Sequence, residues 1–316
     1  MSWFPSAAPA MLRRRADLLR SIRHFFHARG VLEVETPCLS RAGATDPAIE
    51  SLTVTLPEAT LWLHTSPEFP MKRLLAAGSG DIYQIARVFR AGEAGRFHNP
   101  EFTLLEWYRV GFDHHRLMAE VDDLVRGLAG DRLSRPTIWL SYRQAMLDHA
   151  GIDPLHADVG ELADRARALG LDVRGELDRD GWLDLIMSMV VAPALPADGL
   201  TFIHDYPASQ AALARICPEN PAVAERFELY WGGVELANGF HELGDAVEQG
   251  ARFEADNRRR RAAGQAAVAV DHHLLAALAE GLPDCAGVAL GVDRLLMCLS
   301  GCDHIRQVLA FDWERA

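Results

Sequence analysis

The chain reads Phe89-Arg90-Ala91-Gly92-Glu93-Ala94-Gly95-Arg96-Phe97-His98-Asn99-Pro100-Glu101-Phe102 between two segments that predict β-strands, Asp81–Phe89 and Glu101–Val110. The two strands would form a hairpin with a long polar connection. Arginine is the best side chain for clamping phosphate or carboxylate through two parallel hydrogen bonds. Phe102 offers a flat apolar face for a stacked base. Taken alone, the stretch fits a polar loop with solvated charges equally well.

The second of these strands has a polar face. Alternation with a period of two places Phe102, Leu104, Glu106 and Tyr108 on one side of the segment Glu101–Val110.

A second informative stretch runs from Glu228 to Glu242. Two predicted strands, Arg226–Tyr230 and Val234–Phe240, are joined at Gly232-Gly233. Glu228 and Glu235 could meet across this tight hairpin, and two carboxylates with nucleotide phosphates form a natural Mg²⁺ site. Two surface glutamates are the simpler alternative for such a pair.

A third stretch, Gly287-Val288-Ala289-Leu290-Gly291-Val292-Asp293-Arg294, predicts a strand that runs into a helix through small residues. Small residues allow a ligand to approach the backbone closely. Arg294 would lie in the first helical turn, where the helix dipole favours an acid. An arginine in that place needs an anionic or aromatic partner.

Composition restricts the class of protein. The chain has 316 residues, 49% of them hydrophobic, and a formal net charge of −12. This acidic balance weakens a nucleic-acid interpretation, because phosphate contacts need Lys and Arg. Five cysteines without a CxxC pattern predict a reducing, cytoplasmic location. The most apolar stretch, Leu183–Leu195, is too short to span a bilayer.

The order of predicted elements indicates an α+β fold. Hairpins and helices alternate without regular βαβ units, which favours an antiparallel sheet with helices packed around it. The simplest interpretation is one domain over 1–316 with a mainly helical insertion around 113–195. Two capping boxes support helices inside the insertion, at Ser141 with Gln144 and at Asp158 with Glu161.

Together, these stretches resemble the catalytic domain of class II aminoacyl-tRNA synthetases, specifically the lysyl type. Gly30–Pro37 resembles motif 1, which forms the dimer interface in that family. Phe89–Phe102 resembles motif 2, and Gly287–Arg294 resembles motif 3. The resemblance covers nearly the whole chain. It implies the class II antiparallel sheet flanked by helices, a homodimer, and the use of ATP and Mg²⁺.

The resemblance also implies roles for individual residues. Arg90 would contact the α-phosphate and the amino acid carboxylate, while Phe102 and Arg294 would sandwich the adenine. The remaining nucleotide-binding positions would be Glu93, His98, Asn99, Glu235, Leu236 and Gly291. Mg²⁺ would be bound by Glu228 and Glu235. The lysine pocket would comprise Ser66, Pro67, Glu68, Glu106, Tyr108, Asn238, Glu242 and Ala289.

Two departures from the lysyl-tRNA synthetases matter. Motif 1 begins near residue 30, so we expect no N-terminal anticodon-binding domain, and tRNA is disfavoured as the acceptor. The family pattern of Asn-Glu after the motif 2 arginine is replaced by Ala91-Gly92, with the acid displaced to Glu93. Either Glu93 reads the adenine amino group, or backbone groups read it alone.

The sequence is more similar to the stand-alone ligases of this type, which attach (R)-β-lysine to a lysine of translation elongation factor P. The resemblance includes Thr65–Glu68, His98–Phe102 and Pro283–Cys285. Lysyl synthetases usually have glycine at the position of Ala289. Its added methyl group would reshape the pocket floor, and a methyl group is worth about 1–3 kcal/mol of discrimination. It could thereby shift preference from α-lysine to a β-amino acid.

Two alternatives remain open. One is a truncated lysyl-tRNA synthetase that charges tRNA, with Asn257–Arg261 as the best candidate for an RNA contact. A solvated helix face is the preferred interpretation of this run, and a protein-docking patch would also explain it. The other is a non-catalytic synthetase paralogue that regulates a partner. Such paralogues often lose their arginines and acids, whereas Arg90, Arg294, Glu228, Glu235 and Glu242 are all present.

Overall fold

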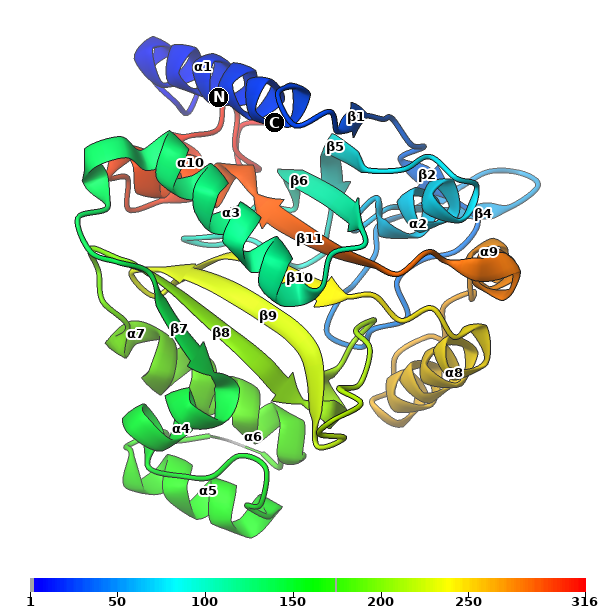
Figure 1. Cartoon of the computed structure of the whole chain (residues 1–316), viewed down its shortest axis with the longest axis vertical. Coiled ribbons are helices and arrows are strands. Elements are labelled where there is room, and N and C mark those ends of the chain that lie inside the picture. The colour runs from blue at the N-terminus through cyan, green and yellow to red at the C-terminus, as the bar shows by residue number, and fades with distance from the viewer. Residues whose placement is uncertain (1–2, 174) are drawn as a thin grey trace. The chain divides into compact units, whose positions relative to one another are not determined.

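A computed structural model describes residues 3–173 and 175–316 of the chain (Figure 1). The chain divides into two compact units. The first unit contains the described residues up to Asp113 together with Glu242–Ala316, and the second contains His114–His241. Each unit is built on its own set of consecutively paired strands, so each is described separately.

The sheet of the first unit has the strand order β1-β5-β6-β11. Its strands are β1 (Leu32–Glu33), β5 (Ile82–Phe89), β6 (Glu101–Val110) and β11 (Cys285–Gly291). β1 pairs with β5 in parallel, whereas β5–β6 and β6–β11 are antiparallel. The register pairs Gln84 with Glu106 and Ala289 with Glu106, so these three residues share a face of the sheet.

Helix α2 (Glu68–Ala76) packs against this sheet through an apolar face. Met71 and Leu75 on the helix form a buried cluster with Ile82, Tyr108 and Cys285. Apolar residues four apart lie on one side of a helix, so this face stays turned to the sheet. The packing fixes the position of the first turn of α2, which carries Glu68.

The rest of the first unit covers the sheet. It comprises the helices α1 (Pro9–His27), α8 (Ala246–Ala262), α9 (His272–Gly281) and α10 (Val292–Ser300), and the small sheet β2 (Leu39–Ser40), β4 (Thr60–Leu63) and β3 (Thr53–Thr55). Helix α1 begins with proline at its first position and buries Leu18, Ile22 and Phe26, spaced four apart. Helices α8 and α9 pack together (Figure 1).

The sheet of the second unit has the strand order β10-β9-β8-β7. Its strands are β7 (Ile138–Ser141), β8 (Leu200–Pro207), β9 (Val223–Trp231) and β10 (Val234–His241), and only β7–β8 is parallel. Gly232 and Gly233 join β9 to β10 with φ of 55° and 77°. A two-residue hairpin turn with both φ values positive suits glycine, which explains the tight connection.

Helices surround the second sheet. They are α3 (His114–Ala129), α4 (Tyr142–Ala150), α5 (Val159–Ala168), α6 (Arg179–Ile186) and α7 (Ala192–Ala194). Helix α3 packs on β9 and β10 (Figure 1). The buried cluster beneath α4, α5 and α6 includes Tyr142, Leu162, Leu183, Ile203 and Tyr206. In the described part of the chain, no helix combines the length and apolarity needed to cross a bilayer.

The structure confirms the predicted α+β class, and β6 begins and ends where the sequence placed it. The capping box of Asp158 with Glu161 is present. Only half of the second predicted capping box is present. The Ser141 side chain caps α4, but the side-chain amide of Gln144 donates to Asp148 at 2.6 Å instead of to the Ser141 backbone. Pro67 precedes α2 rather than opening it, while the Ser66 hydroxyl accepts a hydrogen bond from the Glu68 amide.

Candidate functional site

Four predicted substrate-binding residues gather in the first unit. We call Glu68, Glu106, Tyr108, Glu242 and their partner Lys72 the acidic cluster. Glu68 and Lys72 lie on α2, Glu106 and Tyr108 on β6, and Glu242 directly follows β10, where its amide donates to the Cys285 carbonyl at 3.0 Å. The Tyr108 hydroxyl donates to Glu106 Oε1 at 2.7 Å.

Lys72 was not predicted, and it joins two of the carboxylates. Its Nζ lies 2.6 Å from Glu68 Oε1 and 2.6 Å from Glu242 Oε2. The side chains of Lys72 and Glu242 are each only 1% exposed, and that of Glu68 is 15% exposed. The sequence did contain a signal for this contact, because Glu followed by Lys four residues later favours a helical ion pair.

Burial changes the proton affinities in the acidic cluster. It raises the pKa of Glu106 well above its usual value, and repulsion from Glu68 adds to the shift. Burial raises the pKa of Glu242 to about 7, although Lys72 opposes the shift. Burial lowers the pKa of Lys72, but the Glu242 and Glu68 carboxylates outweigh it and keep the ammonium charged. The cluster thus holds more acid than resident cation.

A glycine on β11 allows this cluster to be compact. A side chain at Gly287 would lie 2.3 Å from the Tyr108 ring and 2.5 Å from Glu242 Oε1. Only glycine lets the strand backbone approach both groups so closely. Ala289 lies two residues further along the same face, opposite Glu106. Its predicted place on the floor of a substrate pocket stays a prediction.

The predicted nucleotide-binding arginines also lie in the first unit. The Arg90 guanidinium carbon is 5.2 Å from the centre of the Phe102 ring, and Arg90 Nη1 is 3.9 Å from Glu93 Oε1. Arg294, in the first turn of α10, contacts His98 Nε2 at 2.7 Å and donates to the Phe97 carbonyl at 3.2 Å. The β5–β6 connection and the start of α10 therefore present two guanidinium groups together with an aromatic ring.

His98 stays neutral in this setting. Partial burial lowers its pKa, and the nearby Arg294 lowers it further. A neutral imidazole can accept the hydrogen bond from the Arg294 guanidinium. His98 thus orients Arg294 in the ligand-free protein.

Asn99 has structural partners. Its Nδ2 donates to the Glu101 carbonyl at 2.7 Å, and its Oδ1 accepts from the Trp313 amide at 2.9 Å. These contacts fasten the C-terminal segment to the start of β6. The predicted role of Asn99 in holding the nucleotide stays a prediction, as does that of Gly291, which caps α10.

The predicted metal ligands lie on the hairpin of the second unit. The β9–β10 register pairs Glu235 with Tyr230 and Asn238 with Glu228, so Glu228, Glu235 and Asn238 share one face. Leu236, predicted to touch the nucleotide, is buried at the irregularity between Glu235 and Ala237. Diagonal cross-strand neighbours lie about 7–8 Å apart, within reach of glutamate side chains.

Arg226, which was also not predicted as a site residue, holds the polar side chains of this face in place. Its Nη2 lies 2.6 Å from Glu228 Oε1, its Nε donates to Asn238 Oδ1 at 3.2 Å, and its Nη1 donates to the Gln210 carbonyl at 2.7 Å. The Tyr230 hydroxyl donates to Glu228 Oε2 at 2.5 Å. Both oxygens of Glu228 are therefore hydrogen-bonded.

The basic run Asn257–Arg261 is only partly a solvated helix face, which corrects the preferred interpretation. Arg260 is 2% exposed, and its Nη2 lies 2.8 Å from Glu50 Oε2. Asn257 is buried and donates to the Val268 carbonyl at 3.0 Å. Two of the five residues thus hold the following loop in place and cannot form an RNA contact.

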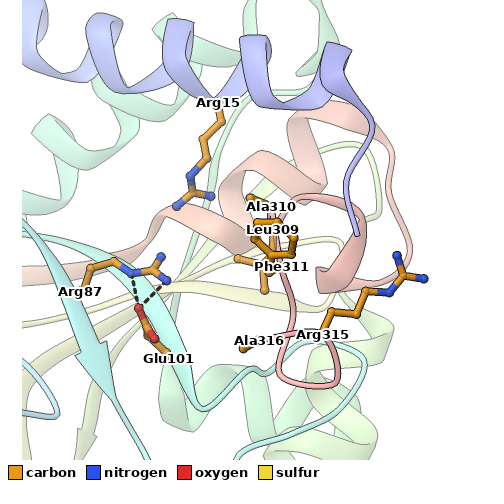
Figure 2. A pocket seen from close by; sticks show the side chains of 8 residues that line it. All are labelled: Arg15, Arg87, Glu101, Leu309, Ala310, Phe311, Arg315 and Ala316. Atoms are coloured by element: carbon orange, nitrogen blue, oxygen red, sulfur yellow. Dashed lines mark hydrogen bonds and ion pairs between the residues drawn. The ribbon is translucent and has the colours of Figure 1, made fainter. Parts of the chain in front are cut away.

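A surface cavity of about 460 Å³ lies apart from all the predicted site residues (Figure 2). It is lined by Arg15, Arg87, Glu101, Leu309, Ala310, Phe311, Arg315 and Ala316. Arg87 Nη2 lies 2.7 Å from Glu101 Oε1 in its wall. Arg15 donates to the Thr103 hydroxyl at 2.6 Å, so its guanidinium is already engaged.

Comparison with known proteins agrees with this arrangement. Residues 3–315 match the family described as class II tRNA synthetases for D, K and N. The chain belongs to this family. As a class II synthetase, it is an ATP-dependent ligase.

Curated relatives of this class II synthetase are similar over their full length. A protein of Vibrio parahaemolyticus is 50% identical over 323 residues, which cover 100% of this chain and 99% of the relative. A protein of Vibrio cholerae is 50% identical over 99% of this chain and 98% of its own. One from Salmonella typhi is 50% identical over 100% and 98%. All three are named elongation factor P–(R)-β-lysine ligase.

Proposed function

We propose that the protein activates (R)-β-lysine with ATP as an aminoacyl-adenylate and transfers it to a lysine side chain of translation elongation factor P. The observation that carries this proposal is the acidic cluster. It places three buried or nearly buried carboxylates around one resident ammonium. Buried charges need partners, so the excess negative charge calls for a cationic ligand. The names of the relatives support a β-lysine substrate and elongation factor P as acceptor.

Activation requires little from the protein beyond positioning and charge stabilisation. The substrate carboxylate attacks the α-phosphorus of ATP, a new C–O–P bond forms, and pyrophosphate leaves. Arg90 would bind the carboxylate and α-phosphate, and Arg294 would cover the adenine opposite Phe102. In the second step, the acceptor amine attacks the activated carbonyl carbon and AMP leaves. Guanidinium groups stabilise the charge that develops on phosphate oxygens.

The hairpin of the second unit suits a magnesium ion. Glu228 and Glu235 lie on one face, and carboxylate oxygens are the ligands that Mg²⁺ prefers. Glu228 Oε1 accepts from Arg226 and Oε2 accepts from Tyr230, and a carboxylate oxygen has two lone pairs, so Glu228 can also bind a metal. We propose that these two residues hold Mg²⁺ with the nucleotide phosphates. The ion would neutralise phosphate charge during adenylate formation.

The test combines activation with transfer. Purified protein is incubated with ATP, Mg²⁺ and either (R)-β-lysine or α-lysine, and offered elongation factor P and tRNA together. Mass spectrometry should show a lysyl-sized mass gain on the factor, larger with (R)-β-lysine. ATP–pyrophosphate exchange measured in parallel reports activation alone.

Other outcomes would redirect the proposal. Aminoacylated tRNA with an unmodified factor would identify the truncated lysyl-tRNA synthetase. Absence of both transfer and exchange would identify the regulatory paralogue. A factor whose acceptor lysine has been replaced by arginine is the matched control, and its modification would contradict transfer to that lysine.

A further inference from the structure

Lys72 occupies an unusual place in both the sequence and the structure. Among the 32 Lys and Arg residues of the chain, it is the only lysine. It is also the buried cation of the acidic cluster, with its Nζ 2.6 Å from both Glu68 Oε1 and Glu242 Oε2. A chain that uses arginine at every other cationic position has an ammonium here. An ammonium is a compact point charge, whereas a guanidinium is planar and larger.

The charges of the cluster can be counted. Glu68, Glu106 and Glu242 contribute three negative charges when ionised, and Lys72 contributes one positive charge. Tyr108 faces the same space and remains neutral, because burial and Glu106 raise its pKa well above the usual value. Cys285 below the cluster is also held neutral, since burial raises its pKa. When all three carboxylates are ionised, the cluster carries two net negative charges, which match the two ammonium groups of a diamino acid.

We propose that Lys72 is a specificity-determining residue, whose resident ammonium sets the acidic cluster to two net negative charges and holds Glu68 and Glu242 apart for a substrate with two ammonium groups. This inference rests on the proposed diamino acid substrate. Without the ammonium, two carboxylates that now share one cation would repel each other. A proton would then replace the cation and join them through a short hydrogen bond. The oxygens joined in that way would no longer accept from a substrate ammonium.

The consequence can be measured as a pH dependence of substrate binding. Glu242 has a pKa of about 7 with Lys72 beside it. The KM for (R)-β-lysine should therefore fall as pH rises through about 7 in the wild type, when the cluster loses its proton. Removal of the Lys72 charge raises the pKa of Glu242 further. The fall in KM must then move to higher pH.

The first experiment uses Lys72→Met, which keeps the length of the side chain without its charge. ATP–pyrophosphate exchange is followed from about pH 6 to about pH 9 with (R)-β-lysine. We expect KM for (R)-β-lysine to rise at least about tenfold near pH 7, and its midpoint to move upward by about one pH unit or more, with little change in KM for ATP. Arg252→Met is the matched control. It removes an ion pair on α8 between Arg252 and Glu248, which are also four residues apart.

A raised KM with an unmoved midpoint would overturn the proposal, because a merely structural role predicts a defect without a change in protonation. Unaltered KM in the variant, with normal exchange by the wild type, would overturn it too and leave the proposed function standing. If the wild type shows no exchange with any diamino acid, the proposed function fails, and the role of Lys72 fails with it.

A second experiment needs no variant for its main result. Because Lys72 is the only lysine, protein labelled with ¹³Cε-lysine gives one lysine ε-carbon signal besides free amino acid. Saturating (R)-β-lysine should shift this signal while the group stays protonated, since a second cation enters the same cluster. Lys72→Met confirms the assignment. A signal whose chemical shift does not change when the substrate binds, or that titrates with an ordinary lysine pKa of about 10.4, would overturn the proposal.

Discussion

Two groups of acids in this protein each contain a resident cation, and the two cations hold their carboxylates in different ways. In the acidic cluster, the Lys72 ammonium forms ion pairs with Glu68 and Glu242, while Glu106 accepts a hydrogen bond from Tyr108. In the second unit, the Arg226 guanidinium pairs with Glu228, and its other contacts go to the neutral Gln210 carbonyl and Asn238 side chain.

The difference separates a binding surface from a scaffold. A guanidinium donates in fixed directions within a plane, so Arg226 locks Glu228 and Asn238 on the sheet face. It is also stacked over Tyr206, with its central carbon 4.4 Å from the ring centre. An ammonium is a point charge without fixed directions in a plane. Lys72 therefore neutralises part of the charge of Glu68 and Glu242 and leaves their oxygens able to accept further hydrogen bonds. The oxygens of the acidic cluster can therefore still turn toward a ligand, whereas the hydrogen bonds of Arg226 fix the orientation of Glu228.

The largest effect should come from Glu242→Gln in the acidic cluster. The change removes one of the two charges that hold Lys72, and breaking a buried pair costs about 3–5 kcal/mol. We expect kcat/KM for (R)-β-lysine in pyrophosphate exchange to fall by about a hundredfold or more, with KM for ATP nearly unchanged. Glu101→Gln, at an exposed carboxylate of β6, is the control. Equal losses in both variants would remove the distinction between the cluster and ordinary surface acids.

Arg226→Met should act on stability first. Glu228 would lose its buried cation, which lowers the free energy of unfolding by about 3–5 kcal/mol. Urea unfolding at neutral pH measures this loss. Arg135→Met removes an ion pair with Asp198 in which both side chains are exposed, and should change nothing measurable. A variant that unfolds like the wild type but has lost all affinity for (R)-β-lysine would place Arg226 with the binding surface instead.

The sequence predicted the parts of the fold that depend on local patterns. Strand β6 follows from its alternation with a period of two, and the cap of α5 follows from residues three apart. Helix α9 and strand β7 were missed. The single-domain boundary, the homodimer and the cytoplasmic location stay predictions. Individual site residues on β6, α2 and β10 were named because the sequence resembles a known family, whose lysine-pocket residues match these positions.

The sequence did not reveal which residues pair with the buried cations. Lys72 meets Glu242 across 170 residues of chain, and no local pattern reveals that contact, although its spacing from Glu68 does suggest half of it. Arg260 was interpreted as part of a solvated face because its run is basic. Its actual partner Glu50 is 210 residues away. Burial of a charge is decided by such long-range pairs, and composition does not contain them.

Ala289→Gly sharpens the comparison by changing the shape of the acidic cluster without its charge. Ala289 lies opposite Glu106 in the sheet, and one methyl group is worth about 1–3 kcal/mol of discrimination. We expect the ratio of exchange rates with (R)-β-lysine and α-lysine to shift toward α-lysine by about 10–200-fold. Ala286→Gly has the same backbone cost on the opposite face of β11 and should leave the ratio unaltered. An unchanged ratio in Ala289→Gly would show that charge alone selects the substrate.

Asp184 of α6 allows the smallest and most specific test of the Arg226 group. Burial raises its pKa to about 6; attraction to Arg226 opposes this shift, and repulsion from Glu228 adds to it. Because the pKa in the folded state is raised, the stabilising contribution of Asp184 is complete below about pH 4 and is lost as pH rises through about 6. The variant Asp184→Asn does not titrate, and its amide oxygen can still accept from Gln210.

Relative to the wild type, Asp184→Asn should therefore gain about 1–2 kcal/mol of unfolding free energy between about pH 4 and pH 7.5, after allowance for the partial exposure of Asp184 to water. Urea unfolding at both pH values measures this difference, and Asp17→Asn at an exposed position of α1 should show none. A gain of the opposite sign would mean that Arg226 attracts Asp184 more strongly than burial disfavours its charge. Arg226 would then stabilise the charge of Asp184 as well as that of Glu228.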